Sequence, residues 1–155
     1  QAVFIFDSSI LNELPRNDQR VRFIHQEIQS LKKEYQDFGS DLNVYFGNPI
    51  ELIPSIAKSL GCSAVYTNRD YEPYALERDK QIFASLEDLG ISFIGSKDHV
   101  IFEKNEVTKD DGLPYTIFTP YARKWKATLT ESSLLSNSTS LYRANAIALY
   151  GCVAA

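Results

Sequence analysis

Few residues suited to metal or redox chemistry occur in this chain of 155 residues, which contains two cysteines, two histidines, one tryptophan and no methionine. Cys62 and Cys152 stand far apart and form no CxxC pair, so neither a zinc site nor a disulfide framework is expected. We therefore expect reduced cysteines, a state typical of a cytoplasmic protein. His25 and His99 have no ligand-type neighbour at metal-binding spacing and are interpreted as ordinary surface histidines.

Long apolar runs and an excess of positive charge are also absent. The apolar stretch at 144–155 is too short and too mixed to span a bilayer, so we expect no membrane partner. The chain has 16 basic and 20 acidic residues, for a net charge of −4. This balance offers no basic surface to DNA, so any nucleic-acid substrate must bind through another part of the protein.

Sequence motifs of enzymatic catalysis are missing as well. The sequence has no GxSxG, HExxH, Walker or GxGxxG pattern, and we expect no independent catalysis from these residues. An initial methionine is missing too, and an apolar run starts directly at Ala2. We therefore expect further residues before Gln1 and after Ala155.

Four short apolar runs predict parallel strands, because continuous hydrophobicity is typical of strands that helices cover on both faces. The runs are Ala2–Phe6, Leu42–Phe46, Ser63–Thr67 and Ile91–Ile94. Helical periodicity lies between them, at Asn17–Phe38, Asn48–Leu60 and Tyr71–Asp88. This alternation with short connections predicts an α/β fold, a doubly wound, Rossmann-like three-layer α/β/α arrangement with a parallel, mainly five-stranded sheet.

The pattern changes after the fourth run. His99–Glu103 predicts a short edge strand, a turn follows at Gly112, and Thr119 is expected to cap a helix that continues through Leu129. We assign residues 1–130 to one α/β domain. Residues 131–155, rich in Ser and Thr and then weakly helical, are interpreted as a linker or as the start of a helical domain.

The densest group of charged and aromatic residues follows the third predicted strand, at 68–79. Ligands of α/β folds bind at such strand-to-helix corners. Asp70 and Glu72 are therefore candidate hydrogen-bond acceptors for a ligand, with Tyr71 or Tyr74 as a stacking wall.

The same segment has an alternative, structural interpretation. Helical spacing puts Glu72 and Asp79 on the stripe that faces the sheet, where a carboxylate needs a partner. An internal ion-pair network, with Arg78 beside Asp79, would then tie this helix to a neighbour. Both interpretations stay open.

A second corner follows the second predicted strand, at Phe46–Pro49. Asn48 is suited to cap the next helix, with Pro49 at its first position. Backbone N–H groups at such a corner also bind phosphates or carboxylates. A plain helix cap and an anion site are therefore both consistent with Asn48.

In their order and spacing, these segments resemble the amino-terminal domain of the DNA photolyase/cryptochrome family, and photolyases most closely. The similarity extends from about residue 3 to residue 129. The segments that carry it are Phe4–Asp7 with Ile10-Leu11, Asn17–Ile24, Gly47–Pro49, Asp70–Tyr74 with Arg78-Asp79, and Tyr115–Tyr121 with Trp125.

This resemblance implies a light-harvesting domain that binds an antenna chromophore. Full-length members are flavoproteins that use blue or near-UV light to repair pyrimidine dimers in DNA, and they hold FAD in a helical carboxy-terminal domain. The implied partners are that helical domain and, through it, damaged DNA. The implied antenna is a deazaflavin, a flavin or methenyltetrahydrofolate, with Asp70, Glu72, Tyr71, Phe6 and Asn48 as its contacts.

Two departures from the family pattern bear on the antenna. The R-R-D-L-R-x-x-D-N-like segment that usually contributes to its pocket is missing. Tyr74 and Ala75 stand where folate-type members carry an Asn-Glu pair, so the resemblance favours a deazaflavin over a folate.

Other functions are consistent with the same fold. A cryptochrome-like photoreceptor domain would signal to a protein partner. A nucleotide-binding protein of the universal-stress or electron-transfer-flavoprotein type shares the architecture, although no Gly-rich phosphate loop is present. In a third alternative the charged corner binds no ligand and forms an interdomain ion-pair surface.

Overall fold

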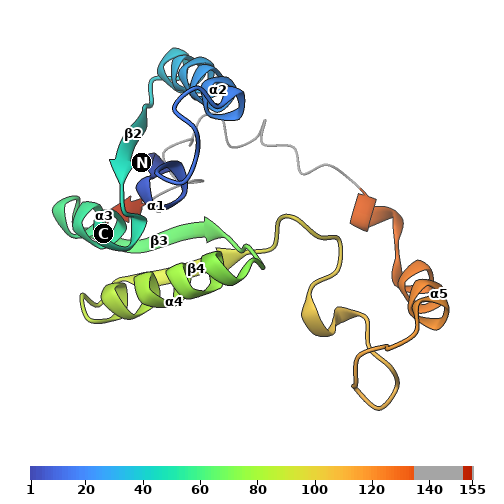
Figure 1. The fold of residues 1–155 in the computed structure, drawn as a ribbon. Helices are drawn as coiled ribbons and strands as arrows, with labels where there is room; N and C mark the ends of the chain where they lie inside the picture. The colour runs from blue at the N-terminus through green and yellow to red at the C-terminus, as the bar shows by residue number, and fades with distance from the viewer. Residues whose placement is uncertain (135–151, 155) are drawn as a thin grey trace. The chain divides into compact units, whose positions relative to one another are not determined.

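The computed structural model describes residues 1–134 and 152–154. The chain divides into two compact units (Figure 1), of which the first comprises Gln1–Ser96 with Ser140–Ala155 and the second Lys97–Thr139. The predicted weakly helical stretch at 141–155 lies outside the described residues, except for a short strand at 152–154.

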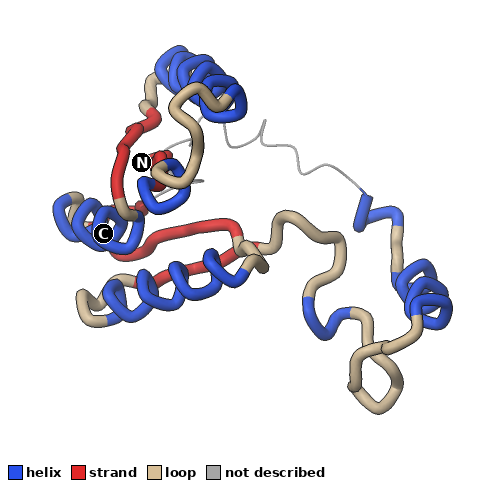
Figure 2. Tube along the Cα trace, viewed as in Figure 1, coloured by secondary structure: helices blue, strands red, loops and turns tan. Residues whose placement is uncertain are grey.

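The first unit contains two small sheets built mainly from parallel strands, drawn in red in Figure 2. β1 (Ala2–Asp7) pairs in parallel with β2 (Leu42–Gly47). β3 (Cys62–Asn68) pairs in parallel with β4 (Ser92–Ser96) and antiparallel with the short β5 (Cys152–Ala154). The four predicted parallel strands and the α/β class are confirmed.

The arrangement of these strands differs from prediction in two respects. They form a two-stranded and a three-stranded sheet in the described part of the chain, and residues of β1 and β3, which do not pair, line one cavity. Burial also alternates along β2, β3 and β4, although their continuous apolar runs predicted cover on both faces. Val44, Phe46 and Tyr66 are exposed.

Four helices surround these strands. They are α1 (Ser8–Leu11), α2 (Gln19–Asp37), α3 (Pro49–Ser59) and α4 (Pro73–Glu87). Asp18 caps α2 by accepting a 2.8 Å hydrogen bond from the Arg20 N–H, and Gly39 with φ of 76° ends it. The predicted helices are confirmed to within a few residues.

Helices lie on both faces of the strands, as a doubly wound fold requires. Ile5 and Asp7 of β1 line the cavity together with residues of α3. Phe6 points to the other face, because side chains alternate along a strand, and its ring lies 6.0 Å from that of His25 in α2.

The main hydrophobic core lies where α3 and α4 pack on each other and on β3 and β4. Ile82 and Leu86 are 1% and 0% exposed. Burying each such side chain contributes about 1.5–3 kcal/mol. The buried residues of this core are Ala57, Cys62, Ile82, Leu86 and Ile91.

Cys62 departs from its expected state. It is buried in this core and disulfide-bonded. The expectation of reduced cysteines is therefore wrong at this position, because wide separation in sequence does not keep two segments apart in the fold.

The second unit contains one α-helix, α5 (Phe118–Thr128), and the short 3-10 helices η1 (Lys104–Glu106) and η2 (Glu131–Leu134) among its described residues. The Trp125 ring packs edge-on against Phe102 at 5.4 Å. The predicted turn at Gly112 is confirmed by a 2.9 Å hydrogen bond from its N–H to the Lys109 carbonyl.

Two sequence predictions for this unit are wrong. No strand forms at 99–103, because the Lys97 ammonium binds the Ile101 carbonyl at 2.9 Å and Glu103 instead caps η1. The helix begins at Phe118 with Ile117 at the cap position, so Thr119 lies inside α5 and does not cap it.

Candidate functional site

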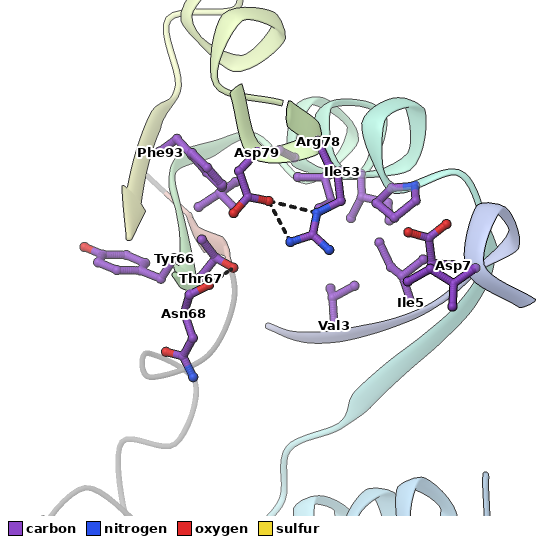
Figure 3. Close-up of a pocket in the computed structure, with 15 residues that line it drawn as sticks. Val3, Ile5, Asp7, Ile53, Tyr66, Thr67, Asn68, Arg78, Asp79 and Phe93 are labelled. Atoms are coloured by element: carbon purple, nitrogen blue, oxygen red, sulfur yellow. Dashed lines mark hydrogen bonds and ion pairs between the residues drawn. The ribbon is translucent and has the colours of Figure 1, made fainter. Parts of the chain in front are cut away.

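A cavity of about 400 Å³ lies between β1 and β3 (Figure 3). Its walls are mainly apolar side chains from β1, α3 and β4, and its polar groups gather at the carboxyl ends of the strands. The apolar lining includes Val3, Ile5, Ile53, Ile56 and Phe93. The polar lining consists of Asp7, Tyr66, Thr67, Asn68, Arg78 and Asp79. Such a combination is typical of sites for small organic ligands.

Asp7 is the buried polar residue of this site, with 8% of its surface exposed. One carboxylate oxygen accepts a 2.8 Å hydrogen bond from the Ser9 N–H and so caps α1. The other accepts a 2.6 Å hydrogen bond from the Tyr74 hydroxyl. Asp7 therefore joins the end of β1 to the start of α4.

The environment of Tyr74 alters its acidity. About 40% of the residue is exposed, but its hydroxyl lies against the buried Asp7. Burial of the hydroxyl and its hydrogen bond to this carboxylate both raise the pKa of Tyr74 above the ordinary value for a phenol. Tyr74 is thus held as a neutral hydrogen-bond donor.

Arg78 and Asp79 form an ion pair on the cavity wall. The Arg78 guanidinium donates to one Asp79 oxygen at 2.7 and 2.8 Å (Figure 3), and it also lies 5.9 Å from the centre of the Tyr74 ring. Arg78 is therefore confirmed as a partner of Asp79, but the pair lies within α4 and does not itself tie this helix to a neighbour. Asp79 is half-buried, as its place on the helix stripe predicted.

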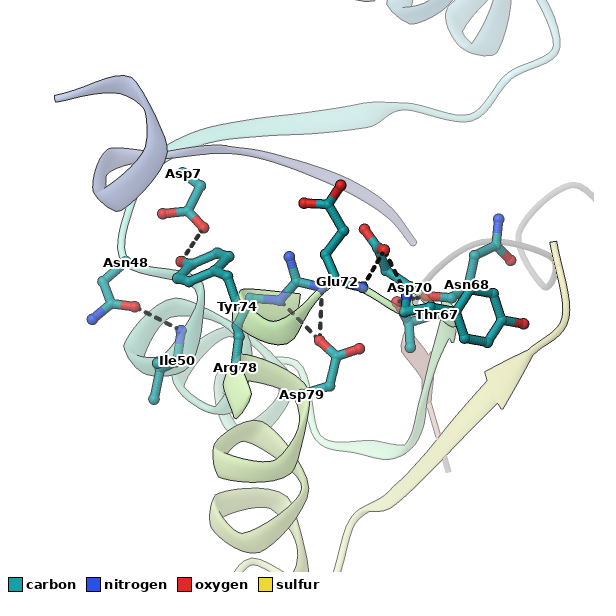
Figure 4. A network of polar contacts seen from close by, with 11 residues as sticks. Asp7, Asn48, Ile50, Thr67, Asn68, Asp70, Glu72, Tyr74, Arg78 and Asp79 are labelled. Atoms are coloured by element: carbon teal, nitrogen blue, oxygen red, sulfur yellow. Dashed lines mark hydrogen bonds and ion pairs between the residues drawn. The ribbon is translucent and has the colours of Figure 1, made fainter. Parts of the chain in front are cut away.

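Asp70 and Glu72 lie at the rim of the same edge (Figure 4) and outside the cavity lining. Asp70 accepts hydrogen bonds from the N–H groups of Tyr71 and Glu72, at 2.6 and 3.1 Å. Glu72 is exposed, which corrects its predicted place on the buried stripe. The reason is that α4 begins at Pro73, so Glu72 is the cap residue with extended backbone and its side chain leaves the helix face.

Asn48 occupies the corresponding position after β2. Its side-chain oxygen accepts a 3.0 Å hydrogen bond from the Ile50 N–H, and Pro49 opens α3 (Figure 4). The helix-cap interpretation of Asn48 is confirmed. Gly47 before it has φ of 151°, and a Cβ there would lie 3.0 Å from Leu52, so the corner needs glycine.

Four of the five residues proposed as chromophore contacts lie just after strand ends, and none of the five lines the cavity. Asn48 directly follows β2, whereas Asp70, Tyr71 and Glu72 follow β3, which belongs to the other sheet. Phe6 is separated from them, since it points to the α2 face of β1.

Sequence reasoning missed Asp7 as a member of the site, along with the hydrogen bond that Tyr74 makes to it. A signal was present: an Asp or Asn comes at or just after the end of each of β1, β2 and β3, as Asp7, Asn48 and Asp70. All three side chains accept hydrogen bonds from backbone N–H groups one or two residues later.

The side chains of this site are suited to binding a ligand. It offers apolar walls, carboxylate acceptors and an ion-paired guanidinium. Among the described residues, no group of three or more His, Cys, Asp or Glu side chains is placed to hold a metal ion. No helix of the described chain is long and apolar enough to cross a membrane.

Comparison with known proteins gives consistent matches. A family model described as DNA photolyase matches residues 1–139. An uncharacterized 31.6 kDa protein of Synechococcus sp. (strain PCC 6716) is 38% identical over 81% of this chain and 44% of its own length. A deoxyribodipyrimidine photo-lyase of another Synechococcus strain (PCC 6301) is 34% identical over 81% of this chain and 26% of its own length.

A solved structure shares the fold. The archaeal photolyase of Sulfolobus tokodaii superposes with a TM-score of 0.60 and 27% identity, over 79% of this chain and 27% of that one. The description of that crystal structure names two FAD molecules and a novel light-harvesting cofactor. The chain thus spans less than half the length of these relatives.

Proposed function

The chain belongs to the DNA photolyase family, and from this premise we propose that its first unit holds an antenna chromophore in the cavity between β1 and β3. One observation carries the proposal: a cavity of about 400 Å³ with apolar walls and polar groups at the strand ends. Ligand pockets of about 300–1,000 Å³ suit a planar heterocycle of two or three rings.

Different residues of the site would contact different parts of the chromophore. Ile5, Ile53 and Phe93 would contact the faces of the heterocycle. Asp7, on the lining, and Asp70, at the rim, would accept hydrogen bonds from its N–H or O–H groups. A deazaflavin or flavin fits this division better than methenyltetrahydrofolate, because Tyr74 and Ala75 replace the family's folate-type pair.

The activity of the whole protein is part of the same proposal. The relatives are two to four times longer than the matched region, which leaves room for the helical FAD domain as the partner of this chain and for damaged DNA as the substrate bound there. We also propose a cytoplasmic location, because the DNA to be repaired lies inside the cell. Residues 1–155 by themselves would harvest light without repairing pyrimidine dimers, and repair by this chain alone would contradict the assignment.

Ligand-dependent stabilisation tests chromophore binding. We expect 5-deazariboflavin to raise the melting temperature of the chain, because a ligand that binds only the folded state stabilises it by RT ln(1 + [L]/Kd). Ile53→Trp would fill the cavity and abolish the shift. Ile24→Trp is the matched control, since it adds the same ring on the exposed side of α2, and it should leave the shift intact. An equal rise in melting temperature in both variants, or no rise in the unaltered chain, would show that the chromophore does not bind in this cavity.

A further inference from the structure

We propose that this cavity selects an uncharged planar heterocycle and rejects a phosphorylated one, so that riboflavin-type compounds bind and FMN, FAD and nucleotides do not. The inference rests on the proposed function and specifies the ligand class of the same site. It would set the chain apart from the S. tokodaii photolyase, whose description names two FAD molecules.

Side-chain oxygens already accept backbone N–H groups at each of the three strand-end corners. Phosphates bind the free N–H groups at helix starts beyond the carboxyl ends of strands. Asp7 accepts the Ser9 N–H at 2.8 Å, and Asn48 accepts the Ile50 N–H at 3.0 Å. At the third corner Asp70 accepts two N–H groups, at 2.6 and 3.1 Å. A phosphate that used these N–H groups would have to displace the side-chain oxygen that accepts them.

The start of α4 does not offer a substitute. Its first residue, Pro73, has no N–H. Glu72 is the cap residue and makes no side-chain hydrogen bond to the helix. Its exposed carboxylate stands directly before the remaining N–H groups of the first turn and opposes a second negative charge there.

The charges on the cavity wall also disfavour a phosphate. Two carboxylates, Asp7 and Asp79, and one guanidinium, that of Arg78, line the cavity. This guanidinium is held by Asp79 at 2.7 and 2.8 Å (Figure 4). The remaining N–H groups of Arg78 could still donate to a phosphate, but Asp79 already balances the positive charge that would attract one.

The groups that stay available suit a neutral ligand rich in donors. Carboxylate oxygens accept hydrogen bonds and donate none, so hydroxyl and N–H groups of a ligand complement them. The ribityl hydroxyls and the ring N–H of riboflavin are such donors. The apolar walls from β1 and α3 suit the isoalloxazine faces.

Riboflavin and FMN provide a matched pair of probes, because they share the ring and differ by one phosphate. We would titrate the 155-residue chain with each at low ionic strength and follow flavin fluorescence. Riboflavin should bind about tenfold more tightly or better, and added salt should narrow the difference by screening the repulsion. Equal or tighter binding of FMN would overturn the selectivity while leaving the chromophore site intact. Binding of neither would refute the proposed function, and the selectivity with it.

Two charge-removing variants sharpen the test. Asp79→Asn keeps an oxygen for Arg78 but removes one negative charge, and Glu72→Gln does so at an exposed position where folding is not at risk. Each should raise the affinity for FMN relative to that for riboflavin by about threefold to tenfold. The control is Glu87→Gln, at the opposite end of α4, which should change neither. An unchanged ratio of the two affinities in both test variants would overturn the electrostatic argument.

Discussion

The two halves of the first unit differ in how much of their helices they bury. In one half, α4 packs on β4 and α3 and buries Ala75, Ile82 and Leu86. In the other, α2 packs on β2 and has no buried residue, although its apolar residues recur at the same helical spacing. Phe23 on α2 is 62% exposed. Helical periodicity thus predicts where a helix forms, while burial depends on how much surface it meets.

Polar contacts also join α2 to its neighbouring strand. The Lys32 ammonium donates to the Leu42 carbonyl at 2.8 Å and pairs with Asp41 at 2.8 Å, joining α2 to the start of β2. The candidate site draws Asp7 from this half and Arg78 from the other. The hydrogen bond between Tyr74 and Asp7 joins the two halves. We therefore expect the site to depend on the well-packed α4 half, which this hydrogen bond links to the weakly packed α2 half.

Removing a large side chain from each half should give the largest contrast. Leu86→Ala should lower the free energy of unfolding by about 2–5 kcal/mol, because it leaves a cavity in the core. Ile24→Ala on α2 should cost less than about 1 kcal/mol, since Ile24 is 42% exposed. Urea unfolding followed by circular dichroism measures both. Similar losses in the two variants would show that the halves are packed alike.

A substitution at the corner after β2 should cause the next largest loss in the free energy of unfolding. Gly47→Ala should cost about 1–3 kcal/mol, because a φ of 151° is strained for alanine and its Cβ would press on Leu52. Gly39→Ala is the matched comparison: its φ is 76° but nothing lies within 4 Å of the added Cβ, so about 1 kcal/mol is expected. An equal cost at both positions would mean that the contact with Leu52 adds nothing.

Breaking the link between the halves should have a smaller effect. Tyr74→Phe removes the hydrogen bond to Asp7 and should cost about 1 kcal/mol. Tyr66→Phe is the control, because Tyr66 is also 40% exposed.

A raised pKa means that the folded state binds the Tyr74 proton more tightly than the unfolded chain does. The stability that Tyr74 contributes should be fully present below about pH 10 and decline as the pH rises through the raised pKa. A stability difference between the chain and Tyr74→Phe that stayed constant through that range would contradict this.

The smallest effect concerns the exposed start of α2. The hydrogen bonds from the Arg20 side chain and backbone lower the pKa of Asp18 to about 2. A lowered pKa stabilises the fold above the ordinary value near 3.8 and loses that contribution as the pH falls through about 2. NMR titration of the Asp18 carboxyl in the chain and in Arg20→Gln should show a higher pKa in the variant. The same pKa in both would mean that Arg20 does not contribute.

The sequence predicted the elements better than their assembly. Apolar runs located all four parallel strands, and Asn48-Pro49 marked the start of α3, because strand burial and helix capping are local properties. The separation of β1 from β3 and the disulfide at Cys62 depend on contacts between distant segments. Glu72 was placed on the wrong face because α4 begins two residues later than predicted, at Pro73 and not at Tyr71.

The candidate site was predicted in part for the same reason. Asp70 and Asn48 were proposed as contacts from their places at strand ends, which are visible in the sequence, and they stay predictions because neither lines the cavity. Asp7 was missed because its role depends on Tyr74, 67 residues away. Phe6 was grouped with the site although the alternation along β1 turns it toward α2.

Methyl NMR of the chain during riboflavin titration tests chromophore binding in the cavity most directly. The resonances of Ile5 and Ile53, which line the cavity, should shift on binding. Those of Ile24 and Ile28, on the opposite face in α2, should stay in place. Shifts confined to the α2 methyls, or no shift at any of the four, would contradict the account.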